Sequence, residues 1–111
     1  MTVTVKVLVP AKTAENTQTT QYVALGVTTI IDKFTATNYS ASAATISVNL
    51  VTGADTAGSQ NLIVKTKTIQ AGETYTFPEI VGQMLAPSGF ISTIAGTASA
   101  INIRASGREV S

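Results

Sequence analysis

Six carboxylates are the only acidic side chains in the 111-residue chain, which contains no His and no Cys. Glycoside hydrolysis requires two carboxylates on opposite sides of the scissile bond, but no two acidic residues form a D-x-D or E-x-x-E motif. A serine nucleophile would need a lysine as its base, and neither G-x-S-x-G nor S-x-x-K occurs. The carboxylates are Glu15, Asp32, Asp55, Glu73, Glu79 and Glu109. The sequence therefore predicts a protein that is not an enzyme.

Cofactor and metal sites have equally little support. The 8 glycines are scattered singly, and no phosphate-binding or dinucleotide-binding glycine motif is present. Calcium requires a cluster of oxygen ligands, whereas Asp55 is the only carboxylate in the turn-rich stretch 52–60. The Cys and His ligands of a structural zinc site are missing altogether. We expect no cofactor and no bound metal.

The charge balance argues against nucleic acid or a membrane as the partner. Only 12% of the residues are charged, against roughly 25% in an ordinary soluble domain, and the net charge is +1. No apolar run is long enough to span a bilayer. A cationic stripe would form only if the strands that carry the following residues were neighbours: Lys65, Lys67, Arg104 and Arg108.

The aromatic residues divide into two groups. Phe34, Tyr75, Phe77 and Phe90 fall on apolar positions of predicted strands, so we expect them in the core. Tyr22 and Tyr39 lie near predicted loops, where an exposed ring can stack on a sugar. Together with Asp55 they are the candidate recognition residues of a module that binds a carbohydrate or a host receptor.

The elements that must position these side chains are strands. The chain contains 19 Thr, 11 Val and 10 Ile but only five Leu, and β-branched side chains pack well on a sheet and lose rotamer freedom in a helix. In 43–51 the apolar residues alternate with Thr45, Ser47 and Asn49, which we expect to face solvent. Alternation and turn residues predict strands at 2–9, 22–25, 28–37, 43–51, 61–69, 74–77, 89–95 and 98–106, and a short helix or irregular crossing at 78–87.

This pattern predicts an all-β fold with about eight short strands and no βαβ alternation. We expect an antiparallel β-sandwich of jelly-roll or Greek-key topology. The chain is short enough to form one domain over 1–111. Within it, 1–20 reads as an N-terminal strand followed by a polar connection, and 21–111 as the sandwich itself.

Several segments resemble the small β-sandwich virion proteins of tailed bacteriophages, and the likeness covers most of residues 20–111. The resemblance implies a structural role in the virion, most specifically as a capsid decoration (cement) protein that binds the major capsid protein or another virion protein. Tail and neck positions are the near alternatives, and assembly would occur in the bacterial host cytoplasm. The segments are 37–40 (Thr-Asn-Tyr-Ser), 46–51, 69–75 (Ile-Gln-Ala-Gly-Glu-Thr-Tyr), 88–93 and 104–109.

The N-terminal strand lies largely outside this resemblance. Val3, Val5, Val7 and Val9 share one face of it, before Pro10 removes a ladder donor. A strand set apart by a polar connection can pair with a neighbouring subunit as easily as with its own sheet. We therefore expect either an assembly arm in a homo-oligomer, for which a trimer is one option, or an ordinary strand of the chain's own sandwich.

Overall fold

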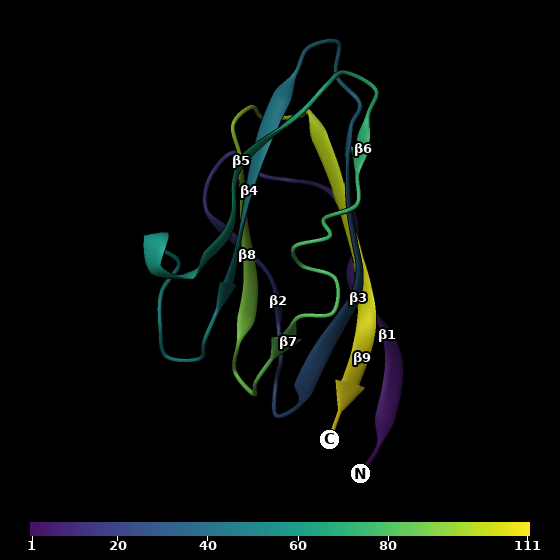
Figure 1. Ribbon diagram of the computed structural model, residues 1–111, viewed down its shortest axis with the longest axis vertical. Coiled ribbons are helices and arrows are strands. Elements are labelled where there is room, and N and C mark those ends of the chain that lie inside the picture. The colour runs from purple at the N-terminus through teal and green to yellow at the C-terminus, as the bar shows by residue number, and fades with distance from the viewer.

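The computed structural model describes all residues, 1–111, and the predicted all-β sandwich is confirmed. Two antiparallel sheets face each other, and both termini lie at one end of the molecule (Figure 1). The strands are β1 (Val3–Thr13), β2 (Thr19–Val23), β3 (Thr28–Asn38), β4 (Ala44–Val51), β5 (Leu62–Ile69), β6 (Thr74–Tyr75), β7 (Met84–Leu85), β8 (Phe90–Ala95) and β9 (Ile101–Val110), with one 3₁₀ turn, η1 (Ser59–Asn61).

The strand order is that of a jelly roll. The five-stranded sheet runs β1-β9-β3-β6, with β7 also paired to β3, and the four-stranded sheet runs β2-β8-β4-β5. Most connections cross from one sheet to the other, and the first and last strands lie side by side. Of the two predicted topologies, the order of the strands therefore selects the jelly roll.

The core lies between the inner faces of the sheets. Phe34 and Phe77 are fully buried and meet edge to face, with ring centroids 4.8 Å apart. Tyr75 packs on Phe77 at 4.7 Å but is only half-buried. Phe90, also expected in the core, is half-buried and lies outside the main apolar cluster.

The connection predicted at 11–20 is shorter in the structure, where only 14–18 separate β1 from β2. β1 continues through Pro10 to Thr13, and β2 begins at Thr19. Pro10 is tolerated because it lies in the terminal strand of its sheet, where the register with β9 shifts between Val9 and Lys12. β1 pairs with β9 along its whole length, so the N-terminal strand belongs to the chain's own sandwich.

Of the two alternatives predicted for 78–87, the structure shows the irregular crossing and not the short helix. The segment turns irregularly after Phe77, buries Ile80 and then forms the short strand β7. A left-handed backbone at Gly82, with φ of 90°, interrupts any helical continuation. In β4, Ser47 and Asn49 are buried rather than solvent-facing, because neighbouring parts of the chain cover this outer face of the four-stranded sheet.

Candidate functional site

The predicted assembly residues occupy the outer edge of the five-stranded sheet. Val3, Val5 and Val7 expose 52%, 83% and 41% of their surface, whereas Val9 is buried. The register with β9 shifts between Val7 and Val9, so that Leu8 is the extra residue of a bulge. A bulge reverses the alternation of side chains, and Val9 therefore turns into the core. We call residues 3–7 of β1 the valine edge.

The three exposed valines lie on the outer face of their sheet. Thr4, Glu109 and Thr29 form one row across β1, β9 and β3. Thr29 is fully buried, so this row faces the other sheet. Because side chains alternate along a strand, Val3, Val5 and Val7 point to the opposite side, away from the core.

The backbone of the valine edge is also open. Thr2 and Ser111 exchange two backbone hydrogen bonds of 2.9 Å, and the register then continues without a shift from Val3 to Val7. Bonded and non-bonded pairs alternate in an antiparallel ladder, so Val3, Val5 and Val7 occupy non-bonded pairs with β9. Their N–H and C=O groups therefore point away from β9, and β1 is the last strand of the sheet.

The charges beside the valine edge are paired within the chain. Lys6 Nζ lies 3.3 Å from Glu109 Oε2, and the Tyr22 hydroxyl donates a hydrogen bond to the same carboxylate oxygen. This hydroxyl, and after it the Lys6 ammonium, hold the pKa of Glu109 below its ordinary value of 4.5.

On the outer face, Arg108 binds Asp32 through two hydrogen bonds of 3.0 and 2.9 Å. Arg108 faces Val5 across the β1–β9 ladder, so this ion pair borders the valines. A neighbouring strand would therefore meet no uncompensated charge at the valine edge.

The candidate recognition residues do not come together. Tyr22 is 8% exposed, and its hydroxyl contacts Thr29 Oγ1 at 2.6 Å, so it is not the stacking platform that its position near a loop suggested. Burial, and after it the Glu109 carboxylate, raise the pKa of Tyr22 to about 12. Tyr39 is half-exposed in the β3–β4 connection, at the end of the sandwich remote from the termini, and Asp55 belongs to the separate β4–β5 connection (Figure 1).

The proposed cationic stripe is also absent. Lys65 and Lys67 lie on β5 of the four-stranded sheet, whereas Arg104 and Arg108 lie on β9 of the five-stranded sheet. The condition for a stripe, that these strands are neighbours, is not met. The two lysines and the two arginines therefore lie on different sheets and form no common stripe.

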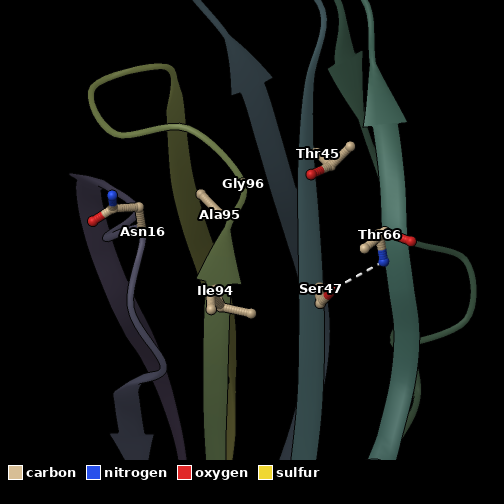
Figure 2. A pocket seen from close by; sticks show the side chains of 7 residues that line it. All are labelled: Asn16, Thr45, Ser47, Thr66, Ile94, Ala95 and Gly96. Atoms are coloured by element: carbon tan, nitrogen blue, oxygen red, sulfur yellow. Dashed lines mark hydrogen bonds between the residues drawn. The ribbon is translucent and has the colours of Figure 1, made fainter.

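A shallow groove of about 250 Å³ lies on the four-stranded sheet, where β8, β4 and β5 run side by side (Figure 2). Ser47 Oγ accepts a 2.8 Å hydrogen bond from the Thr66 N–H and ties β4 to β5. Hydroxyl groups can bind polar ligands, but the lining contains neither a titratable group nor an aromatic ring. The lining residues are Asn16, Thr45, Ser47, Thr66, Ile94, Ala95 and Gly96.

Sequence reasoning missed a buried amide network on the same face. Asn49, which is 2% exposed, donates to Asn61 Oδ1 at 2.7 Å and to the Gly58 carbonyl at 3.0 Å. Gln18 donates to Asn49 Oδ1 at 3.3 Å and to Ser92 Oγ at 2.7 Å. These bonds hold the β4–β5 connection against the sheet. Alternation alone assigned Asn49 to solvent, and no local signal in the sequence reveals its cover.

No group of three or more His, Cys, Asp or Glu side chains is arranged to hold a metal ion. None of the helical structure is long and apolar enough to cross a membrane. No protein-family model, curated protein or solved structure matches this chain.

Proposed function

We propose that this protein is a non-enzymatic structural component of a bacteriophage virion, and specifically a capsid decoration protein that binds and stabilises the shell. The observation that carries the proposal is the valine edge, which combines exposed apolar side chains with outward-pointing backbone groups. Such an edge binds another chain by extending the sheet.

The remaining outer surface also suits protein contacts. It is rich in Thr and Ser and poor in charge, with 12% charged residues in the whole chain. Hydroxyl and amide groups lose less free energy than ammonium or carboxylate groups when a partner covers them. A subunit with this surface can dock on a shell protein at low desolvation cost.

The assignment to a virion rests on the resemblance of the segments between residues 20 and 111. The jelly roll agrees with it, since this fold occurs in viral capsid proteins, but lectins share the fold as well. The alternative is a module that recognises a carbohydrate or a host receptor, and capsid binding distinguishes it from a decoration protein. On our proposal the partner is the major capsid protein or another virion protein, and tail or neck positions are variants of the same structural role.

The test is to add the purified protein to phage capsids assembled without it, and to measure cosedimentation and the temperature at which the capsids rupture. We expect the wild type to bind and to raise that temperature. The Val5→Lys variant should bind at least about tenfold more weakly, because a charge is then introduced into an apolar contact.

Leu25→Lys is the matched control, because Leu25 is as exposed as Val5, at 80% against 83%, but lies in a loop. It should bind like the wild type. A protein that ignores capsids and is retained on a glycan array would overturn the proposal in favour of recognition.

A further inference from the structure

The valine edge has the geometry to pair with itself. We propose that residues 3–7 of β1 pair antiparallel with the same residues of a second copy, about a two-fold axis at Val5. The inference rests on the proposed function, since it names a partner for the same edge. The two five-stranded sheets would then form one continuous sheet across the dimer.

The direction of the backbone N–H and C=O groups along β1 favours this arrangement. In an antiparallel pair centred on Val5, Val5 faces its own counterpart and Val3 faces Val7 of the second copy. All three are residues whose N–H and C=O groups already point outward. They would form about six main-chain hydrogen bonds, two at each facing pair, without breaking any bond between β1 and β9.

The side chains agree with the same register. All six valines would line one face of the new ladder, where β-branched residues directly opposite each other stabilise a sheet. On the other face Lys6 would lie opposite Thr4 of the second copy. No two like charges would therefore be directly opposed at the new contact.

The charges in this register are compensated within each copy. Thr4 pairs with Glu109 in β9, so the row that holds Lys6 of one copy continues through Thr4 to Glu109 of the other, two strands away. The two Lys6 side chains would be diagonal neighbours across the axis, and each lies 3.3 Å from Glu109 of its own chain. Each lysine at the new contact would therefore keep a carboxylate beside it.

The other sheet edges are protected against such pairing. β5 carries Lys65 and Lys67, and Thr66 between them has a left-handed backbone with φ of 44°. β6 and β7 have two residues each, and β2 contains a register shift. Charges, irregularities and short length are the usual devices that keep edges apart. The valine edge is regular until the bulge at Leu8, and its single charge, Lys6, is paired with Glu109 on the inner face.

The contact is small, and this sets the strength that we expect. A stable dimer commonly buries about 1,200–2,000 Å² in total, whereas five residues of each chain pair here. We therefore expect a reversible dimer with a dissociation constant in roughly the micromolar to submillimolar range. Further contacts in a particle would strengthen it.

The first test is sedimentation velocity over a range of concentrations that spans this dissociation constant. The wild type should shift from one to two chains as the concentration rises. Val5→Pro should weaken dimerisation at least about tenfold, because it removes an outward donor that the fold does not use. Its circular dichroism should stay that of the wild type, since proline is tolerated at such edge positions.

The second test determines the register and does not depend on the proline variant. The chain contains no Cys, so a single introduced thiol reports on its own contacts. Val5→Cys should form an intermolecular disulfide at least about tenfold faster than Val3→Cys or Leu25→Cys, because only Val5 faces itself, with the two Cα atoms about 5.5 Å apart. Equal rates for the three variants would overturn the two-fold register.

The outcomes separate this inference from the proposed function. A protein that remains monomeric at every concentration, but whose binding to capsids is lost in Val5→Pro, would overturn self-pairing and leave the decoration role intact. A protein that dimerises through Val5 but does not bind capsids would overturn the decoration role and leave self-pairing intact.

Discussion

The two long edge strands of the sandwich, β1 and β5, present different surfaces to solvent. β5 carries two lysines and an irregular backbone at Thr66, whereas the valine edge of β1 is regular and has an apolar outer face. Both strands are exposed and both end a sheet. Exposure alone therefore does not make an edge strand pair with another chain, because charge and irregularity decide whether a second strand can align with it.

A tyrosine, a glutamate and a lysine form a cluster beside each of these two strands, and the two clusters differ in burial. Beside β1, the buried Tyr22 donates to Glu109, which Lys6 also contacts. Beside β5, the half-buried Tyr75 donates to Glu79 at 2.6 and 2.8 Å, and Lys67 Nζ lies 4.6 Å from the centre of the Tyr75 ring. The first cluster anchors β1 to the core, and the second lies on the surface.

The largest effect should come from Gly107→Ala, a change in β9 of the sheet that ends in β1. Gly107 faces Lys6 in the β1–β9 ladder, and a Cβ there would overlap the carbonyl oxygen of Ile30 in β3. We expect the free energy of unfolding to fall by about 3 kcal/mol, since backbone must move to relieve the overlap. Urea denaturation followed by circular dichroism measures this.

The control for Gly107→Ala is Gly72→Ala. Gly72 has φ of 78° but open space around it, so only backbone strain of about 1 kcal/mol applies. Equal losses in the two variants would show that the packing of β9 against β3 is looser than the structure implies.

A smaller effect should follow when the protection of β5 is removed. In a Val5→Pro background, which blocks the valine edge, replacing Lys65 and Lys67 by valine should produce weak association that the background lacks. We expect an increase of about tenfold in the association constant, measured by sedimentation. The matched control replaces both lysines by arginine and keeps the charge. A monomeric double-valine variant would assign the protection to the irregular backbone at Thr66 instead.

The smallest effect concerns the two tyrosines at alkaline pH. The pKa of each is raised from 10.0 to about 12, mainly by burial for Tyr22 and mainly by the hydrogen bond to Glu79 for Tyr75. Because the folded-state pKa lies above the ordinary value, the resulting stabilisation is complete below pH 10 and is lost as the pH rises through about 12.

Absorbance at about 295 nm follows tyrosinate formation and separates the two causes. Glu79→Gln should return the pKa of Tyr75 most of the way to its ordinary value, whereas Glu109→Gln should leave the pKa of Tyr22 raised. A full return of the Tyr22 pKa in Glu109→Gln would mean that burial is not its main cause.

Several strands could be predicted from the sequence because alternation is a local signal. The predicted segments 28–37, 43–51 and 61–69 correspond closely to β3, β4 and β5. The predictions for individual side chains were wrong where a contact with a distant part of the chain decides whether the side chain is buried. Tyr22 can be buried because Thr29 and the distant Glu109 satisfy its hydroxyl, and Val9 turns inward because a bulge interrupts the β1–β9 ladder.

The all-β character of the chain, its lack of His and Cys, and the row of valines at alternate positions near the N-terminus could all be recognised before the fold was known. Each of these properties is carried by residue types or by spacing along the chain. The folded chain was needed to see that β1 pairs with β9, ends its sheet and directs the N–H and C=O groups of Val3, Val5 and Val7 outward. Which backbone groups of a strand point outward depends on the strand it pairs with, and here that partner lies about a hundred residues away in the sequence.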